Sequence, residues 1–321
     1  LTLFTTRVFS DVFISIADME RLSNDALLTQ IQLLDKRICH RIQDTYHISF
    51  FRTNSGICCI PDPTTPPETL ISYANVARRL AKKMISHCCI YSDEIDRQEK
   101  MQAEILHSFH PALEHQEFKI YFQPKVTPCT GAISSAEVLV RWIRNGQMLW
   151  SPAIYIPLFE QNGFVISLDY YIYGKTFQWL QKYSDTLPEH FQISLNVSPL
   201  HFEQPQIFID KIQELLRTYQ VDPTHLTFEI TESTYVNNTD AVNQVIRSFK
   251  QYNIRISMDD FGSGYANLNT VMRLPFSTIK LDRSLLFDIC SDGKRALFYQ
   301  SIVDTFLKMN YHIVSEGVET K

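Results

Sequence analysis

The sequence predicts an α/β protein in which a mostly parallel sheet with its helices follows a smaller α/β unit. Two observations support this prediction. After residue 117, short apolar runs rich in β-branched and aromatic residues alternate with stretches of helical periodicity, a pattern typical of parallel sheets. Before about residue 110 the segments are short and uneven, so the two parts of the chain differ in pattern. The 321 residues suffice for two domains.

The first part of the chain is expected to contain short strands and longer helices. Apolar residues recur at helical spacing over 26–42, and a second helix is expected over 68–85. The run at 61–67 is predicted to be a loop, because prolines this dense cannot complete a helix or a sheet ladder. Strands are expected at 11–17 and 47–60, and a charged connecting helix at 94–116.

The second part is expected to form the sheet and its helices. The expected strands are 118–123, 136–140, 191–197, 226–230, 254–258, 278–281 and 312–314. The helices that separate most of them are expected at 153–161, 170–183, 206–219, 240–252 and 295–309. This count of strands is one fewer than the eight of a closed parallel barrel.

Composition and charge exclude several classes of protein. With 45% hydrophobic and 20% charged residues, the chain has an ordinary globular composition, which excludes wholesale disorder. A net charge of −5 provides no overall basic field, so polymeric DNA or RNA is not expected as the main partner. No apolar run approaches the roughly 18–20 residues of a membrane-spanning helix, and no segment reads as a signal peptide.

The composition therefore favours a cytoplasmic protein. The chain begins with Leu1 and not with Met, so we expect it to be part of something longer. Tethering to the inner membrane by segments upstream of Leu1 stays open. The seven cysteines include the doublets Cys58-Cys59 and Cys88-Cys89 without any CxxC pair, which predicts neither a disulfide framework nor a zinc site. Buried thiols in a reducing cytoplasm explain the set better than metal binding by Cys39-His40 or by His87 with its neighbours.

Carboxylates, amides and one lysine lie within or directly after most strands of the second part. They are Glu137, Asn196, Glu229, Glu232, Asp259, Asp260, Lys280, Asp282, Glu316 and Glu319. The C-terminal ends of parallel barrel strands converge on one face, so these side chains are expected to meet there. Helix capping would explain a single Asp or Asn. It does not explain glutamates, which are poor caps, or a lysine among acids.

A cluster of this kind predicts bound cations, because about five carboxylates on one face repel each other unless cations neutralise them. Oxygen ligands without a His-rich or Cys-rich set favour a hard ion such as Mg²⁺ or Mn²⁺. The adjacent Asp259 and Asp260 could serve two ions, which clamp the attacking and leaving oxygens of a phosphoryl displacement. The residues alone therefore suggest metal-assisted hydrolysis of a phosphate ester.

Several motifs occur in order and with regular spacing between Leu113 and Thr320. They are Gln123-Pro124, EVLVRW at 137–142, NVS at 196–198, EITES at 229–233, DDFGSGYANL at 259–268, KLD at 280–282 and EGVET at 316–320. With these motifs the sequence resembles the EAL-domain family of cyclic di-GMP phosphodiesterases. Val138 stands where the family has alanine, a change that we expect activity to survive. The resemblance implies a (β/α)8 TIM-like barrel over 117–321.

The resemblance also implies a role for each matched residue. Two ions, Mg²⁺ or Mn²⁺, would be bound by Glu137, Asn196, Glu229, Asp259 and Asp260, with Asp259 bridging them. The catalytic residues would be Lys280, which holds a bound water and balances phosphate charge, Glu316, which orients or deprotonates the attacking water, and Glu232, which anchors the loop Asp260–Ala266. The ligand would be contacted by Gln123, Arg141, Asp282 and Glu319. In-line attack would open cyclic di-GMP to linear pGpG, and a homodimer through this domain is implied.

The resemblance leads us to expect more chain than the sequence contains. The sequence stops at Lys321, just after the seventh expected strand, whereas the family implies a further helix, an eighth strand with a Gln-Gly motif and a closing helix. We expect that a C-terminal tail is omitted, because a barrel without it has an open edge that favours aggregation.

Residues 1–93 resemble a degenerate GGDEF domain, followed by the linker helix 94–116. In the segment 14–25 only Asp18 and Asn24-Asp25 match that family's metal-binding strand, and Ile16 replaces its first aspartate. The signature loop would fall at Asn54–Cys58 and has lost its acids, so cyclase activity is not expected. A packing or dimerising spacer and a regulatory nucleotide site both stay open.

Three functional hypotheses remain. An active phosphodiesterase is favoured, because all the matchable acids and Lys280 are present. A catalytically inactive receptor would bind cyclic di-GMP through Gln123 and Arg141 and signal through the linker helix, but such modules usually lose metal ligands. A scaffold with two vestigial domains would require the C-terminal tail to be truly absent.

Overall fold

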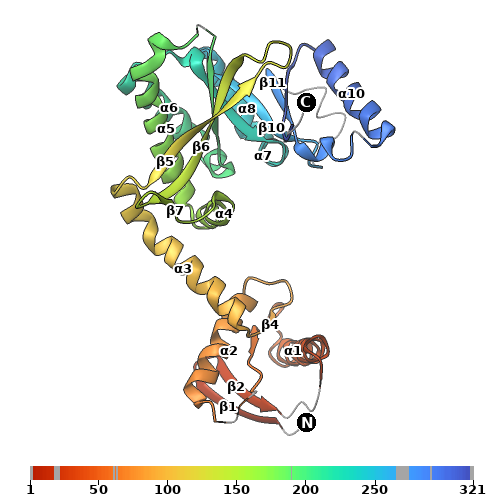
Figure 1. Ribbon diagram of the computed structural model, residues 1–321. Coiled ribbons are helices and arrows are strands. Elements are labelled where there is room, and N and C mark those ends of the chain that lie inside the picture. Colours follow the sequence, from red (N-terminus) through yellow and green to blue (C-terminus); the bar gives the residue numbers. More distant parts are fainter. Residues whose placement is uncertain are drawn as a thin grey trace. The chain divides into compact units, whose positions relative to one another are not determined.

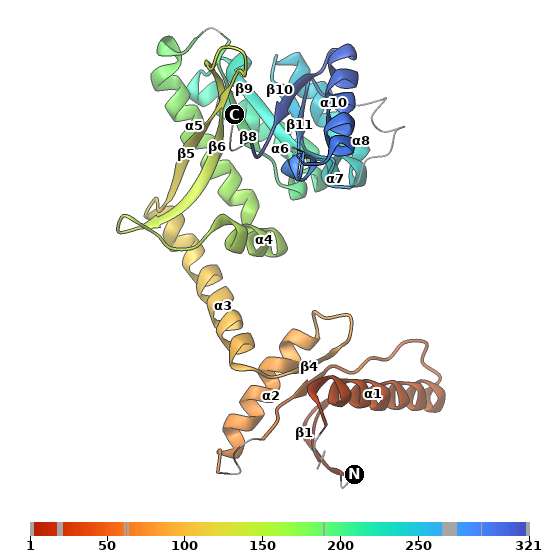
Figure 2. The same cartoon turned by 45° about the vertical axis from the view of Figure 1, so that its right-hand side comes forward.

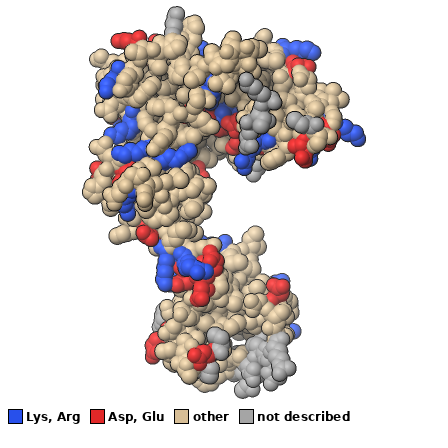
Figure 3. All heavy atoms as spheres, in the orientation of Figure 1, with Lys and Arg blue, Asp and Glu red and all other residues tan. Residues whose placement is uncertain are grey.

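The computed structural model describes residues 3–17, 22–60, 62, 64–188, 190–264, 275–289 and 291–318. The chain divides into two compact units, residues 1–105 and 106–321, and each is described by itself (Figures 1 and 2). On the face shown in Figure 3, acidic and basic side chains both occur on each unit. None of the described helices is both long enough and apolar enough to cross a lipid bilayer.

The first unit contains two small two-stranded sheets and three helices, the last of which continues into the second unit. Its elements are β1 (Leu3–Phe9), β2 (Val12–Ala17), α1 (Asn24–Tyr46), β3 (Ser55–Ile57), α2 (Pro67–Ala81), β4 (Cys88–Ile90) and the start of α3 (Asp93–Glu114). β1 and β2 form an antiparallel hairpin, whereas β3 and β4 are parallel and are connected through α2. The Ser23 hydroxyl accepts a hydrogen bond from the Ala26 amide and so caps α1.

The structure corrects three expectations about the elements of this unit. Of the segment 47–60 only β3 is a strand, because only these three residues pair with β4. β3 also lies within Asn54–Cys58, where the resemblance to the GGDEF family placed a loop. The helix expected over 68–85 ends at Ala81, since the chain then continues in hydrogen-bonded turns toward β4.

The cysteines also depart from expectation. The six described cysteines are all free thiols, but only Cys88 and Cys89 are buried, and Cys59 and Cys129 are exposed. Burial therefore does not explain the whole set. Asp18, which was matched to a metal-binding aspartate, lies outside the described residues.

The second unit is built around a curled sheet with the strand order β12-β11-β10-β9-β8-β6-β5. Its strands are β5 (Phe118–Val126), β6 (Ile133–Arg144), β8 (Gln192–Asn196), β9 (Leu226–Thr231), β10 (Arg255–Phe261), β11 (Thr278–Leu281) and β12 (His312–Ser315), with β7 (Gln147–Met148) beside β6. β5 is antiparallel to β6, and the other neighbours along this order are parallel. Every expected strand of this unit is present.

Helices alternate with these strands (Figure 1). They are α4 (Pro152–Asn162), α5 (Phe164–Tyr183), α6 (Pro205–Tyr219), α7 (Glu232–Asn237), α8 (Thr239–Gln251) and α10 (Gly293–Lys308), with short 3₁₀ turns at 184–186, 199–203, 223–225 and 283–286. The alternation confirms the predicted α/β fold of the TIM-like barrel type. Within the described residues, β5 and β12 are the end strands of the sheet order.

Aromatic side chains fill the space between the sheet and its helices. Phe228 of β9 is fully buried. Its ring centroid lies 5.4 Å from that of Tyr173 in α5, 5.9 Å from that of Phe208 in α6 and 5.1 Å from that of Phe249 in α8. One strand residue therefore contacts three helices through a single ring.

The end of α3 belongs to the second unit and packs against its core. Phe109 is fully buried, and its ring centroid lies 6.0 Å from that of Phe118 in β5, 4.7 Å from Phe159 in α4 and 4.8 Å from Phe164 in α5. Only residues 115–117 separate α3 from β5.

Replacing Phe228 with alanine removes the ring that contacts these three helices. We expect Phe228→Ala to lower the free energy of unfolding of the second unit by about 3–5 kcal/mol, because the buried cavity is only partly refilled. Urea denaturation followed by tryptophan fluorescence measures this unit selectively, since Trp142, Trp150 and Trp179 are the three tryptophans of the chain. The control is Phe298→Ala, at a 59% exposed position of α10, which should cost at most about 0.5 kcal/mol. Equal losses would contradict the core assignment.

Candidate active site

The register of the sheet brings predicted polar residues together. Gln123 of β5 is paired with Glu137 of β6 in the antiparallel register, and Asn196 of β8 is paired with Glu229 of β9 in the parallel register. The side-chain amide of Asn196 donates a hydrogen bond of 3.0 Å to Glu137 Oε1. Residues that are far apart in the sequence thus lie side by side on neighbouring strands.

Lys280 of β11 stands at the centre of this region, and its side chain is only 2% exposed. Its ammonium nitrogen lies within 3.0 Å of carboxylate oxygens of four residues: Glu137 Oε2 at 3.0 Å, Glu229 Oε2 at 2.5 Å, Asp259 Oδ1 at 3.0 Å and Glu316 Oε1 at 2.8 Å. Burial alone would lower the pKa of Lys280, but these negative charges raise it well above its ordinary value. The amine is therefore protonated at neutral pH.

Glu229 is almost completely buried and lies between two lysines. Burial alone would raise the pKa of Glu229, but Lys280 and Lys125 beside it bring that pKa below its ordinary value. Lys125 Nζ lies 2.6 Å from Glu229 Oε1 and 2.9 Å from Ser194 Oγ. Lys125 was not among the predicted site residues. Its place two residues after Gln123 is the signal that could have found it, because alternate residues of a strand share a face.

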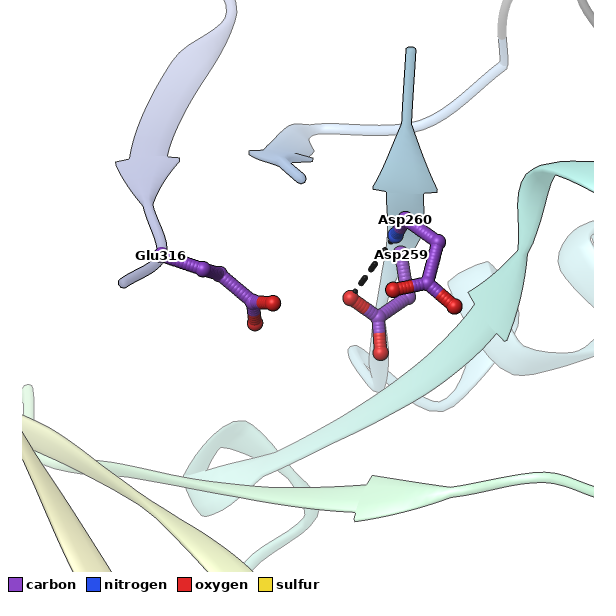
Figure 4. A group of neighbouring side chains, drawn as sticks. All are labelled: Asp259, Asp260 and Glu316. Carbon is purple, nitrogen blue, oxygen red and sulfur yellow. Dashed lines mark hydrogen bonds between the residues drawn. The ribbon is translucent and has the colours of Figure 1, made fainter. Parts of the chain in front are cut away.

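Asp259, Asp260 and Glu316 form a second group of facing oxygens (Figure 4). One carboxylate oxygen of each lies within 4.8 Å of the others, and Glu316 points from the end of β12 toward the two aspartates of β10. Burial and the negative charges of Glu229 and Glu316 raise the pKa of Asp259 to about 7. Burial and the charge of Glu316 also raise the pKa of Asp260. Burial is the largest cause of both shifts, and the neighbouring carboxylates add to it.

This donor set fits divalent cations. The carboxylates concerned are those of Glu137, Glu229, Asp259, Asp260 and Glu316. The positively charged side chains beside them are Lys125 and Lys280. When all are ionised, the two lysines leave three negative charges uncompensated. The donors are oxygens without thiolates or imidazoles, which suits Mg²⁺ or Mn²⁺. Glu137, Asn196, Glu229, Asp259 and Asp260 are thus available for the metal-binding role that the resemblance implies.

Glu232 holds the loop that follows β10. Its buried side chain accepts a hydrogen bond of 2.8 Å from the Gly262 amide to Oε2. Gly262 has a φ of +99°, and a Cβ there would lie 2.7 Å from Leu285 Cδ1, so only glycine fits without strain. This contact matches the anchoring expected for Glu232 in the part of the loop that the structure describes. Ala266, at the far end of the expected loop, lies outside that part.

The predicted ligand-contacting residues have different surroundings. Arg141 Nη1 donates a hydrogen bond of 2.8 Å to the Val140 carbonyl. Asp282 caps the 3₁₀ turn at 283–286, because its Oδ1 accepts a hydrogen bond of 2.9 Å from the Ser284 amide. Hydrogen bonds from Ser284 hold the pKa of Asp282 below its usual range. Capping thus applies to Asp282, whereas Glu137, Glu229 and Glu316 converge on Lys280. Glu319 lies outside the described residues.

A buried pair behind Asn196 was not predicted from the sequence. Asp169 Oδ2, from α5, accepts a hydrogen bond of 3.3 Å from the Ser198 amide and lies 2.9 Å from His201 Nε2. The Ser198 hydroxyl donates to Glu160 Oε1 at 3.0 Å. These contacts fix the chain immediately after Asn196. Asp169 gave no signal in the sequence, because it stands in an aromatic helix that reads as core.

Residues 106–321 match the family model of the EAL domain. The bifunctional diguanylate cyclase/cyclic di-GMP phosphodiesterase MucR of Pseudomonas aeruginosa is 28% identical to this chain, and the match covers 98% of this chain and 46% of MucR. The cyclic di-GMP phosphodiesterase PdeR of Escherichia coli is 24% identical over 93% of this chain and 46% of its own length. The chain therefore spans less than half the length of these relatives.

A solved structure of the MucR phosphodiesterase in complex with c-di-GMP is similar to this chain, with a TM-score of 0.63 and 30% sequence identity. The similarity covers 68% of this chain and 88% of that one.

The raised pKa of Asp259 leads to a prediction for the metal-free protein. The folded state holds the proton of Asp259 more tightly than the unfolded chain, whose pKa is about 3.9. This group therefore stabilises the fold at low pH, and that stability is lost as the pH rises through about 7. Asp259→Asn keeps the neutral form at every pH. In EDTA, we expect the variant to melt several degrees above the wild type near pH 8 and at a similar temperature near pH 4.

Thermal unfolding followed by circular dichroism measures both curves. Saturating Mn²⁺ near pH 8 should reverse their order, because an ion that binds only the folded wild type raises its melting temperature. A difference between the two proteins that does not change with pH would contradict the raised pKa of Asp259.

Proposed function

Because this chain belongs to the EAL domain family, we propose that it hydrolyses cyclic di-GMP to linear pGpG with two divalent ions, Mg²⁺ or Mn²⁺. The observation that carries the proposal is the cluster of carboxylates around Lys280, which retains negative charge for cations to neutralise. The relatives named as cyclic di-GMP phosphodiesterases, and the c-di-GMP complex of one of them, support the choice of substrate.

The ions would be held by Glu137, Asn196, Glu229, Asp259 and Asp260. When bound, they would neutralise the phosphodiester and lower the pKa of the attacking water. Lys280 is protonated and already faces these oxygens, so it can stabilise the negative charge that develops on the phosphate.

The chain's own side chains would position water and substrate. Glu316 is 31% exposed and lies 2.8 Å from Lys280, which suits a group that orients the water and accepts its proton. Attack of the water oxygen on phosphorus breaks the bond to the 3′ oxygen, which takes up a proton and leaves as a hydroxyl group. Gln123 and Arg141 share a face of the β5–β6 pair with Glu137, where Arg141 can form a charge-assisted bond to phosphate.

Asp282 and Glu319 complete the proposed ligand contacts. Burial and the charges of Glu316 and Asp282 raise the pKa of Asp260, which supports a place for Asp282 beside the site. We further propose a homodimer through the second unit and a degenerate GGDEF-like first unit that binds a nucleotide. The match to bifunctional MucR over 98% of the chain supports the GGDEF-like interpretation.

A catalytically inactive receptor for cyclic di-GMP is the second candidate. One observation favours it: Lys125 and Lys280 already pair with Glu229, which reduces the need for metal at that residue. The enzyme is favoured because, within the described residues, every acid that the family motifs require is present.

Incubation of the purified protein with cyclic di-GMP and either Mg²⁺ or Mn²⁺ tests the proposal. We expect pGpG as the product, identified by anion-exchange chromatography and mass spectrometry, and no product in EDTA. Glu137→Ala should lower the rate at least about a hundredfold, because it removes a metal ligand and leaves Asn196 without its partner.

Glu214→Ala is the matched control, since Glu214 is exposed on α6 and pairs only with Lys211 among the described ion pairs. It should keep the wild-type rate. Tight binding of cyclic di-GMP without turnover in either metal would favour the receptor and refute the enzyme.

A further inference from the structure

We propose that Lys125 is a positioning residue that fixes the carboxylate of Glu229 for cation binding. This inference rests on the proposed function, in which Glu229 is a metal ligand. The two oxygens of Glu229 are held by different lysines: Oε1 lies 2.6 Å from Lys125 and Oε2 lies 2.5 Å from Lys280. A carboxylate held at both oxygens cannot rotate freely. Its side chain is 1% exposed, so water cannot replace a lost partner.

Lys125 reaches Glu229 across two intervening strands. The sheet order places β6 and β8 between β5 and β9. The backbone of Lys125 pairs with Ser135 of β6, while its ammonium group contacts Ser194 Oγ on β8 at 2.9 Å. It also lies 3.9 Å from Glu137 Oε2. With its side chain only 16% exposed, Lys125 extends within the barrel and touches two of the predicted metal ligands.

A lysine next to a cation site has two opposing effects. Its charge repels a divalent ion, whereas its hydrogen bond orients the ligand. Lys125 contacts Oε1, and the other oxygen faces Lys280, around which Asp259 and Glu316 also gather. Lys125 therefore holds the side of Glu229 that points away from this group. Partners that orient a metal ligand typically contribute 10–100-fold in affinity, so we infer that orientation outweighs repulsion.

Direct titration with Mn²⁺ alone, by calorimetry, tests this inference without substrate. Lys125→Met keeps the unbranched apolar stem of the side chain but removes the ammonium group, and we expect it to bind Mn²⁺ about 10–100-fold more weakly than the wild type. In the hydrolysis assay, the Mn²⁺ concentration that gives half the maximal rate should rise by a similar factor. The KM for cyclic di-GMP at saturating Mn²⁺ should stay unchanged if Lys125 acts by positioning Glu229, whereas a direct contact with the substrate would raise it.

Lys211→Met is the matched control, because it removes a lysine that makes an ion pair of 2.8 Å on the surface of α6. It should bind Mn²⁺ like the wild type. Ser194→Ala removes only the hydroxyl contact of Lys125 and should weaken Mn²⁺ binding several-fold, so it decides the question if Lys125→Met does not fold. Unchanged or tighter binding by a folded Lys125→Met, or by Ser194→Ala in its place, would overturn the inference.

The two proposals fail in different ways. A wild type that binds Mn²⁺ but leaves cyclic di-GMP intact would refute the proposed function, while weaker Mn²⁺ binding by Lys125→Met would still support the inference. A wild type that hydrolyses cyclic di-GMP, beside a Lys125→Met variant with unchanged Mn²⁺ affinity, would refute the inference alone.

Discussion

The second unit depends on one buried ammonium group that is surrounded by carboxylates. Lys280 comes from β11, and the acids that pair with it come from β6, β9, β10 and the end of β12. Burying these charges is costly unless each one meets its partner. A slip of one residue in any of these strands would turn the side chain to the other face of the sheet and leave a charge unpaired. The polar cluster and the register of the sheet therefore specify each other.

The carboxylates of this cluster differ in how far the neighbouring lysines balance their negative charge. Among the acids around Lys280, Glu229 is the most buried, and its charge is balanced by two lysines before any cation binds. Asp259 and Asp260 are more exposed than Glu229, and burial together with neighbouring carboxylates raises their pKa values. The negative charge that the two lysines do not balance therefore lies around Asp259 and Asp260, whereas the charge of the more buried Glu229 is balanced.

The sequence predicts the sheet well because its strands are short apolar runs with polar residues at their ends. It predicts the first unit less well, since apolar and polar residues mix over 47–60 and only three residues find a partner strand. For the site, strand-end acids such as Asp259 are conspicuous. Lys125 is not, because it lies on an antiparallel strand and reaches its partner across two others. Asp169 is hidden for a related reason: only the folded chain brings it to Ser198.

The short connection between α3 and β5 has a mechanical consequence. Phe109 packs the end of α3 into the aromatic core, and only residues 115–117 lie between the end of that helix and the strand that carries Gln123 and Lys125. The connection of residues 115–117 is too short to accommodate a rotation or translation of the helix without moving the strand. A displacement of α3 would therefore move β5 and, with it, Lys125, which contacts Glu229. The strand connects the helix mechanically to the proposed metal site.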